Sequence, residues 1–237
     1  MSIVHLSTSA PTRAHLLSPQ EWGYAVGTDF YLTASVNGML TAGNGHELSD
    51  YGWTTTSLGL VAGTGADFIT SVDVGTPGQI QFNAASDLLQ SPAIFGDYKH
   101  AREAQWVLGY LPNRLVVEIY GAFTTAATNE TATGFGLVEA GGSPITAADH
   151  MAFIVSNGTN FVCRSGAASD AGSAVDTSWH MFRIEITVGG SVEWFIDDVS
   201  QGTFAIQTDL WPASFGAGIQ ALGVNVIALS SVHIWYV

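Results

Sequence analysis

Apolar and polar residues alternate along most of the chain from residue 29 to the C-terminus, in short segments separated by Gly, Asn, Asp and Ser. In one such segment Leu115, Val117 and Ile119 fall on one face, while Glu118 falls on the other. A period of two is typical of strands whose side chains alternate between two faces. The pattern predicts an all-β fold of short antiparallel strands, and we expect this strand to be half-buried.

An Asn-Gly pair at 157–158 lies between two apolar-rich runs. This pair favours a tight hairpin turn, because both central residues of such a turn take a positive φ. With these two residues as the loop, Ile154 pairs with Phe161 and Ala152 with Cys163, which gives a continuous apolar face. The sequence therefore predicts a hairpin with this register.

A second hairpin is predicted over 179–204. A two-residue loop at 189–190 would set Ile186 opposite Glu193, which places an apolar side chain against a carboxylate. A three-residue loop at 189–191 avoids this contact and keeps the apolar residues together. It predicts four cross-strand pairs: Val188 with Val192, Ile186 with Trp194, Ile184 with Ile196 and, on the outer face, Arg183 with Asp197.

Helical periodicity is scarce. The best helical candidates are the short stretches 86–90 and 98–105, whereas 124–133 and 165–178, rich in Gly, Ala, Thr and Ser, are expected to be loops. The last segment, 224–237, is apolar on both faces, which is typical of a central strand rather than an edge strand.

The first 28 residues contain Ser, Thr and Pro and show no clear alternation. We expect an extended N-terminal arm (1–28) ahead of one jelly-roll β-sandwich domain (29–237), since single all-β domains often reach this size. The stretch 1–17 lacks the basic start and the apolar run of a secretory signal, which favours synthesis in the cytoplasm without a signal peptide.

Charged residues make up only 11% of the chain, and the formal net charge is −14. A surface with few long charged side chains can pack against a neighbouring chain at little desolvation cost. The acidic balance and the lack of a basic face argue against nucleic acid as a partner. No apolar run reaches the roughly 18 residues that a membrane-spanning helix needs. The single cysteine, Cys163, excludes an internal disulfide and is expected in the core.

The stretch Trp179-His-Met-Phe-Arg-Ile is followed by two glycines and then by Val192-Glu-Trp-Phe-Ile-Asp-Asp198. These two runs resemble the concanavalin A-like lectin/glucanase superfamily, which includes laminin-G-like domains. In that superfamily W-H-x-[FY]-x-I and [FY]-x-[IV]-D-G runs commonly form adjacent strands of a jelly roll, and Asp198 stands where Gly is frequent. The resemblance implies a two-sheet antiparallel sandwich with one concave sheet, which binds glycans or protein surfaces.

Glycoside hydrolases of this superfamily carry closely spaced acids on one strand, as Glu-x-Asp-x-x-Glu, and the sequence has no such run. The best acid pair is Glu185 facing Glu193 or Asp197 across the second hairpin, and we expect these carboxylates to be solvated and outward-facing. Nucleophile elbows and phosphate loops are absent, and no two histidines have metal-ligand spacing. The sequence therefore predicts a protein that is not an enzyme.

Seven tryptophans are candidates for stacking on sugar rings. Trp53, Trp106 and Trp211 lie near predicted loops and are the better candidates for a glycan site or an interface. Trp194 and Trp235 lie in apolar strands and are expected in the core.

Asp197 and Asp198 are adjacent acids at the end of a predicted strand. Together with loop carbonyl groups they offer the oxygen ligands that Ca²⁺ takes, and lectin-like sandwiches often carry such a site. Calcium is the one cofactor that the sequence suggests.

These observations favour a non-enzymatic structural or binding protein that works within an assembly. The leading hypothesis is a phage virion component, such as a capsid decoration or tail-associated protein, which packs against copies of itself or against other capsid or tail proteins. The alternative is a carbohydrate-binding module or lectin. A glycoside hydrolase or polysaccharide lyase is the least favoured class, because it requires an acid pair in a cleft.

Overall fold

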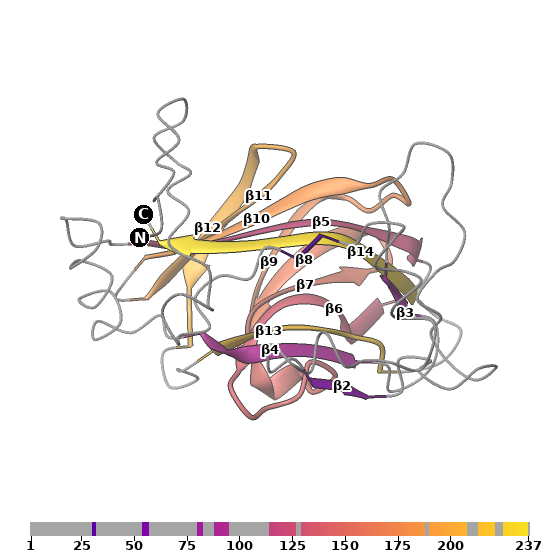
Figure 1. The fold of residues 1–237 in the computed structure, drawn as a ribbon. Coiled ribbons are helices and arrows are strands. Elements are labelled where there is room, and N and C mark those ends of the chain that lie inside the picture. The colour runs from indigo at the N-terminus through magenta and orange to yellow at the C-terminus, as the bar shows by residue number, and fades with distance from the viewer. Residues whose placement is uncertain are drawn as a thin grey trace, which may run out of the picture.

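The chain forms two antiparallel β-sheets that face each other (Figure 1). The computed structural model describes residues 30–31, 54–56, 80–82, 88–94, 114–126, 129–187, 190–207, 213–220 and 225–236. Over these residues the structure is nearly all β, which confirms the predicted two-sheet jelly-roll sandwich. The predicted N-terminal arm, 1–28, lies outside the described residues.

In the described part of the chain each sheet has seven strands, and every pairing there is antiparallel. The first sheet has the order β1-β14-β5-β10-β11-β12, and β3 also pairs with β14. Its strands are β1 (Phe30–Tyr31), β3 (Ile80–Phe82), β5 (Arg114–Ala126), β10 (His180–Thr187), β11 (Ser191–Ile196), β12 (Val199–Ala205) and β14 (Asn225–Tyr236). The second sheet has the order β2-β4-β13-β6-β7-β8-β9. Its strands are β2 (Thr54–Thr56), β4 (Leu88–Ile94), β6 (Asn129–Glu139), β7 (His150–Asn157), β8 (Asn160–Ser165), β9 (Ala168–Ala174) and β13 (Ala213–Gly218).

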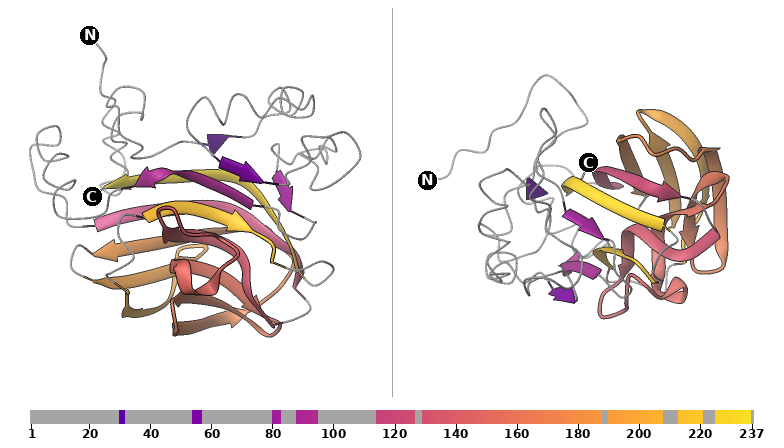
Figure 2. Two further views of the ribbon diagram at one scale, coloured as in Figure 1. Left: turned by 90° about the horizontal axis from the view of Figure 1, so that it is seen from below. Right: turned by 90° about the vertical axis from the view of Figure 1, so that its right-hand side faces the viewer.

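The chain crosses repeatedly between the two sheets, as the views in Figure 2 show. After β5 the chain enters the second sheet for β6 to β9 and returns to the first for β10 to β12. It then adds β13 to the second sheet and β14 to the first. Strands far apart in sequence therefore become neighbours, so that β5 pairs with both β10 and β14. Such crossings between two antiparallel sheets are typical of jelly rolls.

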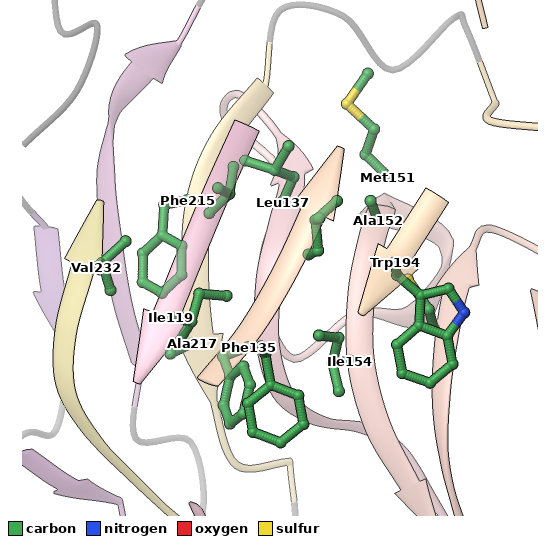
Figure 3. Close-up of a cluster of buried hydrophobic side chains, with 14 of the residues drawn as sticks. Ile119, Phe135, Leu137, Met151, Ala152, Ile154, Trp194, Phe215, Ala217 and Val232 are labelled. Carbon is green, nitrogen blue, oxygen red and sulfur yellow. The ribbon is translucent and has the colours of Figure 1, made fainter. Parts of the chain in front are cut away.

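The hydrophobic core fills the space between the sheets (Figure 3). Four phenylalanine rings interlock at its centre, with ring centroids 5.1 to 5.7 Å apart. They are Phe123 from β5, Phe135 from β6, Phe161 from β8 and Phe182 from β10. Trp194 is also fully buried, which confirms its predicted place in the core. Tilted and edge-to-face ring contacts of this kind stabilise a core beyond the area that they bury.

Strand β5 departs from the predicted half-buried pattern. Val117 and Ile119 face the core as expected, but Val116 and Glu118, which point the other way, are only 3% and 7% exposed. Strand β5 lies inside the first sheet, between β14 and β10, so side chains from both neighbours cover its outer face. The orientation of the residues was predicted correctly, whereas the exposure of the outer face was not.

The hairpin of β7 and β8 forms, but its register differs from the prediction. Ile154 lies opposite Cys163 rather than opposite Phe161. The error is two positions along the partner strand, and side chains alternate with a period of two, so the same residues still face the core.

Asn157 explains why the turn of this hairpin lies one residue later than predicted. Its side-chain Oδ1 accepts hydrogen bonds from the backbone N–H groups of Thr159 and Asn160, at 2.9 and 2.7 Å. Only Gly158 takes a positive φ, of 82°. The Asn157 side chain mimics a backbone turn, and its hydrogen bonds replace the second positive φ that the predicted two-residue loop requires.

The hairpin of β10 and β11 has its loop one residue earlier than predicted, with Thr187 and Ser191 as the last pair. The observed pairs include Ile186 with Val192, Ile184 with Trp194, Arg183 with Phe195 and Glu185 with Glu193. All four predicted pairs are therefore wrong: Val188 with Val192, Ile186 with Trp194, Ile184 with Ile196 and Arg183 with Asp197. Two carboxylates directly opposite each other are normally unfavourable, and here neighbouring arginines offset their repulsion.

Two predicted connections contain strands. The stretch 165–178 includes β9, and the stretch 124–133 contains the end of β5 and the start of β6. Strand β9 consists of Ala, Ser, Gly and Asp and is exposed on both faces for most of its length, so it carries no apolar alternation. An edge strand of this composition cannot be distinguished from a loop by its pattern.

The predicted helix at 86–90 is wrong, because Leu88–Gln90 belong to β4, while the candidate at 98–105 lies outside the described residues. Within the described ranges the one helix is the short 3-10 turn η1 (Ala147–Asp149). No helix there is long and apolar enough to be a candidate membrane span. The C-terminal strand β14 has neighbours on both sides, which confirms its predicted central position.

Candidate functional site

A row of polar side chains crosses the outer face of the first sheet, on the side away from the core. His233 of β14 lies opposite Glu118 of β5, Glu118 opposite Arg183 of β10, and Arg183 opposite Phe195 of β11. The second row of this face pairs Glu185 with Glu193.

We call this surface the charged face. It comprises Arg114, Glu118, Arg183, Glu185, Glu193, Phe195 and His233, together with Asp198 from the adjoining turn. Its residues come from four strands and one turn, and the pairing of β5 with β10 and β14 brings them together.

Ion pairs fix the two arginines of the charged face. Arg114 Nη1 donates to Glu185 Oε2 at 2.8 Å, and Arg183 Nε lies 3.0 Å from Glu185 Oε1. Arg183 also donates to Asp198, and its guanidinium lies over the ring of Phe195, 4.1 Å from the centroid. The Arg183 side chain is therefore held by two carboxylates and one aromatic ring, which leaves it few alternative conformations.

Exposure rises from the middle of the charged face to its edges. Glu118 is 7% exposed, while the side chains of Glu185 and Arg183 are 15% and 20% exposed. At the edges the side chains of Arg114 and Asp198 are 51% and 82% exposed. A ligand on this face could thus contact Arg114 and Asp198 directly and the exposed part of Arg183, while Glu118 and Glu185 lie largely covered beside them.

Glu185 lies directly opposite Glu193, which is one of the two acid pairs predicted from the sequence. Both side chains lie on the outer face, as predicted, but Glu185 is largely covered rather than solvated. Each carboxylate oxygen of Glu185 is engaged by a guanidinium group, and Glu193 accepts a hydrogen bond from Ser200 Oγ at 2.9 Å. The pair is part of an ion-pair network.

A second polar cluster joins the start of β10 to the β11–β12 turn. His180 Nδ1 lies 2.6 Å from Asp197 Oδ2, and His180 Nε2 lies 2.9 Å from Asp176 Oδ1. Asp197 Oδ1 also accepts a hydrogen bond from the backbone N–H of Met181 at 2.9 Å. Because both ring nitrogens face carboxylates, both must carry protons, so the cluster favours the imidazolium form of His180.

Burial of the imidazole disfavours its charge, but the hydrogen bonds to Asp197 and Asp176 outweigh this burial and raise the pKa of His180 above its usual value. The same contact with His180 lowers the pKa of Asp176. With both nitrogens occupied, His180 is a structural cation, and its ring has no nitrogen free to act as a general base.

The two acids predicted to bind calcium lie in the β11–β12 turn, where both take a positive φ, of 50° for Asp197 and 65° for Asp198. Their side chains have different partners, His180 for Asp197 and Arg183 for Asp198. Among the described residues no group of three or more His, Cys, Asp or Glu side chains is placed to hold a metal ion. Calcium binding by these two acids stays a prediction.

The tryptophans predicted to contact a ligand, Trp53, Trp106 and Trp211, lie outside the described residues, as does the side chain of Trp235. Trp179 is partly buried and packs against Tyr120, with ring centroids 5.2 Å apart. Cys163 is fully buried, as predicted, and its burial raises the pKa of the thiol above the usual range.

The sequence pattern points to Glu185 and Glu193 as a possible acid pair, but it does not identify Glu118 and Arg183 as members of a site. Each of these appears in the sequence as one outward-facing polar residue of an amphipathic strand. A weak signal was available, since Glu118 and Glu185 are acids in the middle of amphipathic strands of a chain with only 11% charged residues. Their assembly depends on the strand order of the first sheet, which local patterns do not reveal.

Comparisons with known proteins give distant structural likenesses only. No family model matches the chain, and no curated protein matches its sequence. A conserved carbohydrate esterase from the Shiga toxin-encoding bacteriophage phi24B is 10% identical, with a TM-score of 0.49 over 82% of this chain and 95% of the other.

Two further solved structures are similarly distant. The alginate lyase from Corynebacterium sp. is 13% identical, with a TM-score of 0.46 over 67% of this chain and 77% of the other. The cellulose induced protein Cip1 is 10% identical, with a TM-score of 0.48 over 77% of this chain and 90% of the other. Likenesses this distant assign neither an activity nor a ligand to the chain, and membership of the concanavalin A-like superfamily stays a prediction.

Proposed function

We propose that the chain is a non-catalytic carbohydrate-binding protein whose glycan site is the charged face. The observation that carries this proposal is the position of Arg183, which lies between carboxylates and an aromatic ring on a sheet face that solvent reaches. Sugars present many hydroxyl groups, each of which donates and accepts hydrogen bonds. Planar carboxylates and guanidinium groups at fixed positions match such ligands.

Pre-organisation is the physical advantage of this arrangement. Arginine loses considerable side-chain entropy when a ligand immobilises it, and this loss weakens binding. Here the ion pairs with Glu185 and Asp198 restrict Arg183 before any ligand arrives. The sheet backbone beneath the charged face is also rigid, because β5 and β10 are inner strands of the first sheet.

The proposed lack of catalysis follows from the state of the acid pair. A glycoside hydrolase needs one carboxyl group that donates a proton to the leaving oxygen and a second that acts as nucleophile or base. Arg114 donates to Glu185 Oε2 and Arg183 Nε lies 3.0 Å from Glu185 Oε1, so both oxygens of Glu185 face the protein's own cations, an arrangement that favours a structural role over proton donation. Glu193 alone does not supply both roles.

The test is binding of the full-length chain to a glycan array, followed by titration calorimetry with the glycans that bind. Arg183→Met removes the guanidinium and keeps most of the side-chain length, and we expect it to weaken binding by about tenfold or more, as loss of a charged hydrogen bond at a site does. Glu193→Gln, at a neighbouring position of the same face, removes a charge but keeps a polar side chain and should weaken binding less.

Ser169→Ala is the matched control, because Ser169 is exposed on β9 of the second sheet and is not part of the charged face. It should bind like the wild-type protein, and circular dichroism should show that all variants are folded. Binding that is unchanged in both charged-face variants, or no binding to any glycan, would rule out the proposed site.

The role in an assembly remains a separate prediction from the sequence. The predicted arm lies outside the described residues, and the virion location and the protein partners rest on features of the sequence alone. The two functions are compatible, because a particle component with a glycan-binding face could attach the particle to a surface. Oligomeric state therefore does not decide between them, whereas glycan binding tests the charged face directly.

A further inference from the structure

We infer that the charged face selects saccharides with amino groups over saccharides with acidic groups, an inference that rests on the proposed glycan binding at that face. The starting point is its charge balance. Two guanidinium groups stand against four carboxylates, so the acids of the face outnumber its arginines by two. The arginines are Arg114 and Arg183, and the acids are Glu118, Glu185, Glu193 and Asp198.

The hydrogen-bonding groups point to the same class of ligand. Arg114 Nη1 donates to Glu185, Arg183 Nη1 donates to Asp198, and Arg183 Nε lies in ion-pair contact with Glu185, so each guanidinium already faces acids of the protein itself. A carboxylate accepts about four hydrogen bonds. Glu193 therefore keeps acceptor capacity beyond the one bond from Ser200 Oγ. Glu193 thus leaves acceptor positions on the charged face for a ligand.

An ammonium group fits a surface of this kind, because it carries three donors, no acceptor and a positive charge. An acidic saccharide brings only acceptors in its carboxylate and adds charge of the same sign. The net charge of −14 on the whole chain also repels polyanions over longer distances. By contrast, a face built for uronates or sulfated sugars would need arginines that are not already paired with carboxylates.

The experiment compares two probes of equal length on the full chain: a chitosan hexasaccharide, which carries free amino groups, and an oligogalacturonate hexamer. At low ionic strength and about pH 6, where the amino groups are charged, the chitosan should bind roughly tenfold tighter or more, since each exposed charge pair changes an affinity by up to about fivefold. The preference should shrink at about 0.5 M salt, where screening is strong.

Two variants with the same change in net charge serve as test and control. Glu193→Gln removes one acid from the charged face and should reduce the preference for chitosan severalfold. Glu139→Gln removes one acid at the end of β6 in the second sheet and should leave it unchanged. An equal effect of both variants would show that net charge alone, rather than the charged face, sets the preference, and this would overturn the inference.

The outcomes separate this inference from the proposed function. Equal or tighter binding of the oligogalacturonate would overturn the inference while glycan binding stands. Binding confined to neutral saccharides would also overturn it, because charge would then not select the ligand. No binding of any saccharide class would end the proposed function itself.

Discussion

His150 begins β7 and is completely buried, a rare position for an ionisable side chain. Its ring stacks on Phe153, with centroids 3.9 Å apart. His150 Nε2 lies 2.8 Å from the carbonyl oxygen of Pro144, so this nitrogen carries the proton and donates it. The other ring nitrogen, Nδ1, is buried and has no hydrogen-bond partner in the described part of the chain. Protonation at Nδ1 would place an unpaired N–H and a charge inside the protein.

We predict that this histidine makes the fold sensitive to acid. Burial lowers the pKa of His150 from 6.5 to about 4. Above about pH 6.5 neither the folded nor the unfolded state binds the proton. Between about pH 6.5 and pH 4 the imidazole of His150 binds a proton in the unfolded state but not in the folded state. The free energy of unfolding therefore falls as the pH is lowered through this range. A shift of this size corresponds to about 3 kcal/mol of the free energy of unfolding.

The measurement is urea unfolding of the wild-type protein and of His150→Gln between about pH 4 and 7. Glutamine does not titrate, and its amide N–H can still donate to Pro144. We expect the variant to be less stable at neutral pH, because the ring contact with Phe153 is lost, and to lose less stability on acidification. Equal losses in both proteins would mean that other groups cause the acid sensitivity.

At the scale of elements, the His180 cluster holds the β11–β12 turn against the start of β10. The Asp197 backbone N–H also donates to the carbonyl oxygen of Met181, at 2.8 Å. The turn contains two residues with positive φ, a conformation that costs non-glycine residues energy, and these contacts offset part of that cost. The other groups packed against the imidazole are the rings of Phe161 and Phe182 and the carboxylate of Asp176.

We predict that His180 stabilises the fold more in mildly acidic than in alkaline solution. Its folded pKa is raised above the unfolded value. Its contribution is therefore fully present below about pH 6.5 and is lost as the pH rises through the folded pKa. The difference in the free energy of unfolding between the wild-type protein and His180→Gln should be largest near pH 6 and should narrow towards about pH 9.

Asp176→Asn is the graded control, since it removes one of the two carboxylates that face His180. Its effect should show the same pH dependence with a smaller amplitude, because the contact with Asp197 remains. A stability difference for His180→Gln that does not change with pH would contradict a charged role for this side chain.

The elements also show what the sequence could and could not predict. The core-facing residues of β5, β7, β8, β10 and β11 were predicted correctly, because burial of one face imposes a period of two. In both hairpins the loop lies one residue away from its predicted place, which shifts each residue's cross-strand partner by two positions. A shift of two positions leaves the same faces buried, so the apolar pattern does not distinguish the two registers. In the β7–β8 hairpin the side-chain hydrogen bonds of Asn157 determine which residues form the turn. In the other, arginines from β5 and β10 offset the repulsion between Glu185 and Glu193.

The charged face could not be assembled from the sequence for a related reason. Glu118 and Arg183 are 65 positions apart, yet they lie opposite each other because β5 pairs with β10. Nothing in either strand alone specifies that partner, since many amphipathic strands of similar length would fit. The same holds for the burial of Glu118, which depends on having a neighbouring strand on each side.

At the scale of the whole molecule, the two sheets meet where edge strand β9 of the second sheet lies beside edge strand β12 of the first. Trp194 Nε1 donates to Asp170 Oδ2 at 3.1 Å, and the backbone N–H of Ser173 donates to Gln201 Oε1 at 2.7 Å. This contact closes one side of the sandwich and gives the N–H of a buried tryptophan its partner. The contact protects both edges, which would otherwise expose unpaired backbone groups.

Glycine makes this close approach possible. A Cβ atom at Gly172 of β9 would lie 2.6 Å from Cη2 of Trp194, and Trp194 is fully buried and cannot move aside. We predict that Gly172→Val forces the two edge strands apart and lowers the free energy of unfolding by about 1 to 3 kcal/mol, the usual cost of overpacking. Ala174→Val is the matched control, because Ala174 is exposed two residues further along the same strand and valine favours a strand conformation. Chemical denaturation followed by circular dichroism compares the two, and equal stability of both variants would show that the sheets do not depend on this contact for closure.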